Sequence, residues 1–184
     1  MAAMARDRKW KVEDTRYLLE RPWLRLREDR VRTARGVLIP EFHVMEVADW
    51  SCIVCLSKSG ELVLVRQYRH GVGRQTLELP AGASGPAESA LAVAQRELSE
   101  ETGFMSTKWR HLASVHPEPT RHNHRAHLFL ATDAEQTQEL QLDPTEDVEV
   151  VFRAWADREQ LLSELDHGIH VAALLMSAAY VSDG

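Results

Sequence analysis

The segment from residue 82 to residue 104 constrains the fold of this chain more than any other. Between Ala87 and Glu101 it consists mostly of Ala, Leu, Gln and Glu, residues that favour the α-helix. Pro86 suits the first turn of a helix, because no amide hydrogen is needed there. Gly103 suits the left-handed residue that ends a helix. The segment therefore predicts a helix that runs from about residue 87 to residue 101.

Three carboxylates share one face of this predicted helix. Glu97, Glu100 and Glu101 fall within about 100° of arc, because residues three and four apart are neighbours on a helix. Each pair repels by roughly a few tenths of a kcal/mol, and all three lie near the C-terminal end, where negative charge is unfavourable. A bound cation would offset both costs. Oxygen ligands favour Mg²⁺ or Mn²⁺ over Zn²⁺. A solvated acidic helix end is the alternative interpretation.

The spacing of the whole segment resembles the signature box of the Nudix hydrolases. The matching positions are Gly82, Glu88, Arg96, Glu97, Glu100, Glu101 and Gly103. The resemblance implies a metal site for cutting diphosphates, with Glu97 and Glu101 as direct ligands of Mg²⁺ and Glu100 as a third carboxylate. It implies that the main-chain carbonyl of Ala81 completes the metal's shell. Glu88 and Arg96 are then a structural ion pair, and Gly82 and Gly103 are structural residues of the box.

The composition fits a soluble protein of one domain with a small addition. The chain has 184 residues, 44% of them hydrophobic, which is enough to bury a core. The formal net charge of −6 argues against a broad surface for nucleic acid or for an anionic membrane. The N-terminus lacks the apolar core of a signal peptide, and no stretch approaches membrane-spanning length. We therefore expect a cytoplasmic protein without nucleic-acid or membrane partners.

The two cysteines, Cys52 and Cys55, form a Cys-x-x-Cys pattern that is typical of redox or zinc sites. Here the pattern lies in an apolar, β-branched run that predicts a strand. Residues three apart on a strand point to opposite faces. We therefore expect two buried free thiols.

Further apolar or alternating runs predict strands at 15–19, 24–32, 38–47, 50–56, 62–68, 127–131 and 148–155, with another strand ending near residue 115. Helices are predicted at 157–165, with Asp157 as the cap, and at 169–181. This mixture indicates an α/β fold. The Nudix resemblance implies an α/β/α sandwich with a mixed sheet over residues 49–184, preceded by a small β-domain over residues 1–48.

Sequence outside the box resembles the Nudix branch that hydrolyses ADP-ribose and other nucleoside diphosphate sugars. The resemblance rests on Arg66-Gln67-Tyr68-Arg69, on residues 77–82, on Pro119 and on the N-terminal extension. It implies a homodimer that exchanges the N-terminal β-domain. It also implies that Arg69, and with it Arg66, binds the diphosphate, a task that suits a fork of donors.

Aromatic residues of the N-terminal extension resemble those that clamp the nucleobase in this branch. They are Trp23 and Phe42, and stacking on a base is worth about 1–3 kcal/mol. The alternative is that both rings belong to the core of the small β-domain. We assign Trp50, Trp109 and Trp155 to the core of the hydrolase domain.

The catalytic base of this branch lies on a loop before a late strand, and residues 143–150 fit that loop. Glu146 is the predicted base, and Asp147 is the nearest alternative. Glu149 falls within the following strand. Glu100 is the other carboxylate predicted to take part in catalysis.

The segment from His116 to His124 departs from the branch, which commonly has a turn like Ser-Pro-Gly there. Glu118 stands where a carboxylate often meets the sugar side of the substrate. His122 and His124, with Arg121, are interpreted as a wall near the distal sugar or phosphate. A second metal site formed by the four histidines between residues 116 and 127 is the alternative. The predicted reaction is Mg²⁺-dependent hydrolysis of ADP-ribose to AMP and ribose 5-phosphate. GDP-mannose or another sugar nucleotide, and a non-catalytic module that senses ADP-ribose, remain alternatives.

Overall fold

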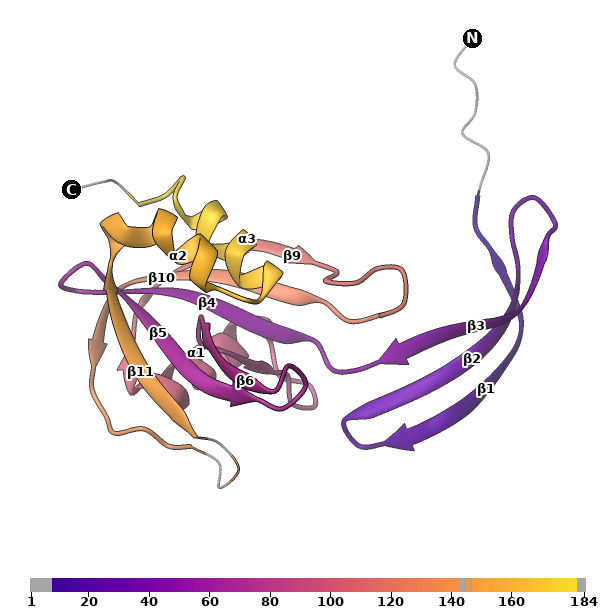
Figure 1. Ribbon diagram of the computed structural model, residues 1–184, viewed down its shortest axis with the longest axis horizontal. Helices are drawn as coiled ribbons and strands as arrows, with labels where there is room; N and C mark the ends of the chain where they lie inside the picture. Colours follow the sequence, from indigo (N-terminus) through magenta and orange to yellow (C-terminus); the bar gives the residue numbers. More distant parts are fainter. Residues whose placement is uncertain (1–7, 143–144, 146, 182–184) are drawn as a thin grey trace, which may run out of the picture. The chain divides into compact units, whose positions relative to one another are not determined.

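The structure is a computed structural model that describes residues 8–142, 145 and 147–181. Its residues form two compact units, labelled by element in Figure 1. One unit comprises residues 1–48 together with 116–124, and the other comprises residues 49–115 and 125–184. The sequence prediction had placed residues 116–124 in the second domain. The division into a dimerisation domain and a hydrolase domain stays a prediction.

The N-terminal unit is an antiparallel three-stranded sheet in the order β1-β2-β3. Its strands are β1 (Lys11–Arg21), β2 (Leu24–Arg32) and β3 (Leu38–Glu46). Gly36 lies in the turn between the last two strands with a φ of 83°, a conformation that glycine adopts without strain. Thr15 and Arg27 both donate hydrogen bonds to the buried carboxylate of Asp29, at 2.8 and 3.0 Å. The bond from Thr15 ties β1 to β2, and the bond from Arg27 holds the carboxylate within β2.

The second unit is built on one eight-stranded mixed sheet with the path β11-β5-β4-β10-β8. The strands are β4 (Trp50–Ser57), β5 (Glu61–Arg69), β6 (Arg74–Glu78), β7 (Ala81–Ala83), β8 (Phe104–Met105), β9 (Lys108–Val115), β10 (Ala126–Gln136) and β11 (Val148–Ala154). β10 pairs with β4 in parallel, and every other pairing is antiparallel.

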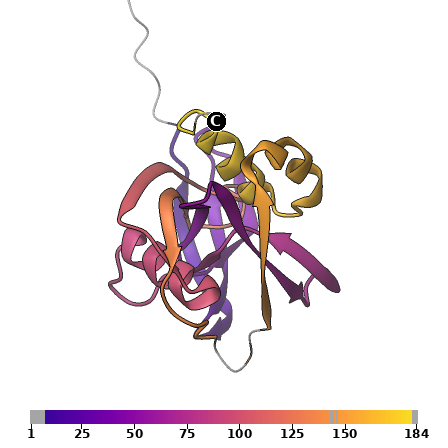
Figure 2. The same ribbon diagram turned by 90° about the vertical axis from the view of Figure 1, so that its left-hand side faces the viewer.

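Helices cover both faces of this sheet, as Figure 2 shows from the side. The helices are α1 (Ala90–Thr102), α2 (Arg158–Glu164) and α3 (Gly168–Ser177). Alternate residues of β4 divide between two cores: Val54 packs with Leu161 of α2 and Leu174 of α3, whereas Ile53 packs with Leu98 of α1. The predicted α/β/α sandwich with a mixed sheet is confirmed. No helix of the described residues is long and apolar enough to cross a membrane.

The two cysteines follow the same alternation. Cys52 belongs to the core beneath α2 and α3, and Cys55 to the core beneath α1, and both are free and buried. Burial raises the pKa of the Cys55 thiol to about 12 and raises that of Cys52 well above its ordinary value. The prediction of buried free thiols is confirmed. Thiols with such pKa values are inert as nucleophiles.

The first helix begins three residues later than the sequence predicted. Pro86 and Ala87 form a turn in which Ala87 has a φ of 59°. Ser89 is the N-cap, and its hydroxyl accepts the amide hydrogen of Ala92 at 3.2 Å. Serine is among the strongest capping residues, so it defines the start in place of proline. Gly103 ends the helix in the left-handed conformation, with a φ of 71°.

The other helices also differ from their predicted boundaries. Asp157 stands at the N-cap of α2, but its side chain makes no capping hydrogen bond. Residues 155–157 form a short 3₁₀ turn before α2, which shifts the helix start to Arg158. α3 ends at Ser177 rather than at residue 181.

Candidate functional site

The carboxylates of α1 meet the short strand β7. Glu97 and Glu101 are buried, and one carboxylate oxygen of Glu101 accepts the amide hydrogen of Ala81 at 3.0 Å. A Cβ atom on Gly82 would lie 2.0 Å from the carboxylate carbon of Glu97. The Glu97 carboxylate can therefore lie against the strand only because residue 82 has no side chain, which explains the glycine physically.

The side chain of Arg96 places a positive charge next to the acidic face of α1. One of its terminal nitrogens, Nη1, lies 2.7 Å from Glu97 and 2.9 Å from Glu100. Its Nε donates to Glu88 at 3.0 Å, and Nη2 donates to the carbonyl of Ala83 at 3.1 Å. The hydrogen bond to Glu88 is the main reason that the pKa of Arg96 is raised and that of Glu88 lowered. The ion pair that the sequence suggested is present, and the same guanidinium also neutralises two of the helix carboxylates.

The donor chemistry of this corner fits a hard divalent cation. Within the described residues, no group of three or more His, Cys, Asp or Glu side chains is already arranged to hold a metal ion. However, two buried carboxylates, Glu97 and Glu101, adjoin a strand segment that has no side chain at Gly82. Oxygen-only donors of this kind suit Mg²⁺ or Mn²⁺. The ligand roles of Ala81, Glu97, Glu100 and Glu101 stay predictions.

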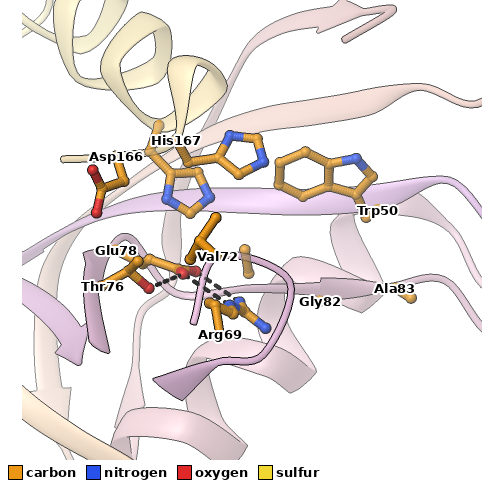
Figure 3. Close-up of a pocket in the computed structure, with 11 residues that line it drawn as sticks. Trp50, Arg69, Val72, Thr76, Glu78, Gly82, Ala83, Asp166 and His167 are labelled. Atoms are coloured by element: carbon orange, nitrogen blue, oxygen red, sulfur yellow. Dashed lines mark hydrogen bonds and ion pairs between the residues drawn. The ribbon is translucent and has the colours of Figure 1, made fainter. Parts of the chain in front are cut away.

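A cavity of about 390 Å³ opens beside β7 (Figure 3). Its lining residues are Trp50, Arg69, Val72, Thr76, Glu78, Ala81, Gly82, Ala83, Asp166, His167 and His170. The structure thus brings Arg69, predicted to bind substrate, into one cavity with Ala81 and Gly82 of the box. The roles of these residues stay predictions. Trp50, which the sequence assigned to the core, packs against that core but also lines the cavity.

Arg69 is held in this cavity by a carboxylate that the sequence analysis did not single out. Its Nε and Nη2 donate to the two carboxylate oxygens of Glu78 at 2.8 and 2.6 Å, and the hydroxyl of Thr76 donates to the same carboxylate at 2.6 Å (Figure 3). Burial alone would raise the pKa of Glu78, but the bonds from Arg69 and Thr76 outweigh it and lower the pKa. An anionic Glu78 therefore fixes the guanidinium in a bidentate pair.

Two histidines of the C-terminal region form the opposite side of the cavity. His170 is buried, and its Nδ1 accepts the amide hydrogen of Leu79 at 3.2 Å. His167 is the N-cap of α3, and its Nδ1 accepts the amide hydrogen of Ile169 at 3.2 Å. The sequence gives little sign of the role of His170, because its partner Leu79 lies 91 residues away. The nearest signal is the three-residue spacing of the two histidines at a helix start.

We expect His170 to make the protein less stable in mild acid. Burial lowers the pKa of His170 to about 3, so the folded state stays neutral where an unfolded chain, with an ordinary pKa near 6.5, takes up a proton. The stability from a neutral His170 is therefore complete above pH 6.5 and is lost as the pH falls toward 3, by up to about 1.4 kcal/mol per pH unit.

His170→Asn is the variant that checks this expectation, because Asn can still accept the amide hydrogen of Leu79 but does not titrate. Urea unfolding between pH 5 and 8 should show a shallower loss of stability in the variant than in the wild type. Equal slopes would mean that His170 is not the group responsible. His70→Asn, at an exposed histidine, is the matched control and should keep the wild-type slope.

Other residues that the sequence singled out in the second unit are not among those that line the cavity; among the described residues these are Arg66, Asp147, Trp109 and Trp155. In the second unit, Arg66 of β5 forms an ion pair with Glu149 of β11 at 3.0 Å. The two residues lie directly opposite each other where these strands pair. Asp147 is exposed, and Glu146 lies outside the described residues. Of the tryptophans that the sequence assigned to the core, Trp155 is buried there, and Trp109 is partly buried beside Phe129.

Trp23, Phe42 and Glu118 all belong to the N-terminal unit. Trp23 is 75% exposed in the turn between β1 and β2. Phe42 packs edge-on against Trp10, with ring centroids 5.8 Å apart, and the Arg121 guanidinium lies 5.2 Å from its ring centre. Glu118 accepts hydrogen bonds from Thr120, which lower the pKa of its carboxyl. The substrate roles of these residues stay predictions.

Comparison with known proteins finds two families along the chain. The NUDIX domain matches residues 45–175, and the domain described as the nucleoside diphosphate sugar hydrolase N-terminal domain matches residues 10–45. Two similar proteins are named ADP-ribose pyrophosphatase. The one from Mycobacterium tuberculosis is 35% identical over 108 residues, 58% of this chain and 52% of the relative. The one from Bacillus subtilis is 31% identical over 100 residues, 54% of each chain.

The chain thus spans about half the length of these relatives. Among solved structures, one described as the crystal structure of ADP compounds hydrolase superposes with a TM-score of 0.82, covering 94% of both chains at 22% sequence identity. At that identity the likeness concerns the fold.

Proposed function

The chain belongs to the Nudix hydrolase family, and from this premise we propose that it hydrolyses the diphosphate bond of a nucleoside diphosphate sugar, with ADP-ribose as the leading substrate. The products would be AMP and ribose 5-phosphate. The names of the relatives support this choice over other Nudix substrates, as does the match of residues 10–45 to the N-terminal domain of sugar-nucleotide hydrolases.

The observation that carries the proposal is the joining of two features in one place. The carboxylates of α1 meet β7 at Gly82, and the same strand lines a cavity that contains the fixed guanidinium of Arg69. A diphosphate needs a divalent cation and a positively charged donor group side by side, because its charge must be offset on more than one oxygen. The proposed metal ligands and Arg69 both lie around β7, and this nearness supports the proposal.

Nudix hydrolases generally use divalent metal ions, and a Mg²⁺ held by Glu97, Glu100, Glu101 and the carbonyl of Ala81 would supply charge neutralisation for the diphosphate. Other residues of the chain orient the groups around the diphosphate. The Nε and Nη2 atoms of Arg69 donate to Glu78, and this pair sets the direction in which the guanidinium faces the cavity. Arg96 and Glu88 hold the end of β7 against the helix, because Arg96 also donates to the Ala83 carbonyl.

The proposed general base is Glu146, which takes a proton from the attacking water as the new P–O bond forms and the bridging P–O bond breaks. Glu146→Gln should lower kcat by about a hundredfold or more while leaving KM within a few-fold, because the change removes the proton acceptor and keeps the size of the side chain. Steady-state kinetics measure both values. Asp147→Asn is the matched control, and if that variant carries the loss instead, the base is Asp147.

The N-terminal unit is proposed to serve dimerisation and base binding. Its first strand is largely exposed, including the apolar side chains of Val12 and Leu18, and Trp23 is exposed at its end. A second copy of the chain would cover this apolar surface. Light scattering that gave a monomer would remove this part of the proposal and the shared role of Trp23 and Phe42. A cytoplasmic location is likewise proposed from the sequence alone.

Product analysis tests the central proposal. Purified protein would be incubated with ADP-ribose, GDP-mannose, UDP-glucose, a diadenosine polyphosphate and ATP, with Mg²⁺ and with EDTA, and the products separated by chromatography. We expect AMP and ribose 5-phosphate from ADP-ribose only with the metal. Faster cleavage of GDP-mannose or UDP-glucose would keep the reaction and change the substrate. Binding of ADP-ribose without cleavage of any substrate would contradict hydrolysis and favour the sensor.

A further inference from the structure

We propose that the wall of the cavity formed by Trp50 and His167, with the buried His170 stacked on His167, binds an uncharged ring of the substrate by stacking. The ring is a group joined to the diphosphate, either a sugar or a nucleobase. This inference rests on the proposed function, because it assigns one subsite of the same substrate. The sequence interpretation gave the residues of this wall no role in substrate binding, and it placed the nucleobase on Trp23 and Phe42.

The wall consists of three rings that contact one another. The imidazoles of His167 and His170 are stacked, with centroids 4.5 Å apart and an interplanar angle of 17°. The indole of Trp50 meets His167 edge-on at 5.3 Å and lies 5.9 Å from His170. Figure 3 shows Trp50 and His167 on the side of the cavity away from Arg69 and Glu78. The rings come from the start of β4 and the start of α3.

Hydrogen bonds to the backbone fix both imidazoles before any ligand arrives. His170 accepts from Leu79, and His167 accepts from Ile169, in each case through Nδ1. A neutral imidazole that accepts through Nδ1 carries its proton on Nε2. Rings held in this way lose little conformational entropy when a ligand stacks on them, and preorganisation of this kind favours binding.

The charges around the wall favour a neutral group over a phosphate. Burial lowers the pKa of both His167 and His170, so both rings are uncharged at neutral pH. The carboxylate of Asp166 also lines the cavity beside them, paired with Arg74 at 2.6 Å. A terminal phosphate at this wall would gain no charged donor from the two rings, whereas an uncharged ring would gain stacking contacts.

The size and position of the cavity fit one end of a diphosphate substrate. Its volume of about 390 Å³ lies within the range of roughly 300–1,000 Å³ that is usual for small-molecule sites. Ala81 and Gly82, which belong to the proposed metal corner, line the same cavity. A substrate held there by its diphosphate would therefore place an attached ring within reach of the wall.

Substitutions of His167 can separate the role of its ring in ligand binding from its role as the N-cap of α3. His167→Asn removes the ring but keeps a side chain that caps helices well, whereas His167→Phe keeps a ring but cannot accept the Ile169 amide hydrogen. Calorimetry with Ca²⁺ in place of Mg²⁺, a hard cation that carboxylate oxygens also bind, would measure the binding of ADP-ribose, AMP, ribose 5-phosphate and inorganic diphosphate to the wild type and to both variants. Thermal unfolding of the same samples reports the effect of the cap.

We expect His167→Asn to bind ADP-ribose about tenfold more weakly at a nearly unchanged Tm, the effect of losing one stacking partner. His167→Phe should keep the affinity within a few-fold while its Tm falls. Weaker binding of AMP by His167→Asn identifies the ring as the nucleobase, and weaker binding of ribose 5-phosphate identifies the sugar. Binding of inorganic diphosphate should be unchanged in either case.

Three results would overturn the inference: wild-type affinity in His167→Asn, an equal loss of affinity in both variants, or an equal loss for inorganic diphosphate. Failure of the wild type to bind any of the four ligands would overturn it as well. The proposed function is judged separately by cleavage. A wild type that binds through His167 but cleaves nothing contradicts the hydrolase and leaves the ring subsite standing.

Discussion

Glu101→Gln should lower turnover of ADP-ribose by about a hundredfold or more while the protein stays folded. Glu101 is buried at the contact between α1 and β7. Glutamine has the same size, and its amide oxygen can still accept the Ala81 amide hydrogen that Glu101 accepts at 3.0 Å. The change therefore removes a charge from the proposed metal site and keeps the local packing. A bound cation contributes several kcal/mol to such reactions, and each 1.36 kcal/mol is about a tenfold change in rate.

Steady-state kinetics with Mg²⁺, thermal unfolding, and Mn²⁺ binding followed by electron paramagnetic resonance would be measured together. We expect lower kcat and weaker Mn²⁺ binding at a Tm within a few degrees of the wild type. Glu164→Gln, the same chemical change at an exposed position of α2, is the matched control and should keep full activity. A folded Glu101→Gln protein with near-normal turnover would exclude Glu101 from the metal site.

Features that depend on local sequence were predicted well. The alternation of buried residues along β4 separates Cys52 and Cys55 onto opposite faces, and the sequence alone was sufficient to predict this. The helix end at Gly103 followed from its tolerance of positive φ. The helix start was predicted wrongly, because Pro86 and Ser89 are both good start signals and only the structure shows that Ser89 is the cap.

Features that depend on distant parts of the chain could not be predicted in this way. The partner of Arg69 is Glu78, which becomes its neighbour only because β5 and β6 pair as a hairpin. The histidines of the cavity reach it from the C-terminal helix, and the apolar surroundings of Trp50 made a core position the simpler interpretation. The proposed base Glu146 lies outside the described residues, so the sequence remains its only support.

Gly82→Ala should abolish most of the activity while changing stability little. The new Cβ would lie 2.0 Å from the carboxylate carbon of Glu97, too close for two atoms that are not bonded. The group that must move is the end of a flexible side chain, so the backbone can remain in place. Turnover and Mn²⁺ affinity should nevertheless both fall, by about a hundredfold for turnover, because the moved carboxylate is a proposed ligand. Gly168→Ala is the matched control, since a Cβ there meets no atom within 4 Å.

A double-mutant cycle with Glu97→Gln tests this cause directly. If Gly82→Ala acts only by displacing the Glu97 carboxylate, a protein with both changes should lose about as much activity as Glu97→Gln alone. Two independent effects would instead multiply, since distant and unrelated sites give additive free energies. kcat/KM for ADP-ribose would be measured for the four proteins of the cycle, with Tm to confirm folding. Multiplied losses, or a fully active Gly82→Ala protein, would show that the close approach of β7 to Glu97 does not control activity. The position of the proposed metal site would then have to be explained without Gly82.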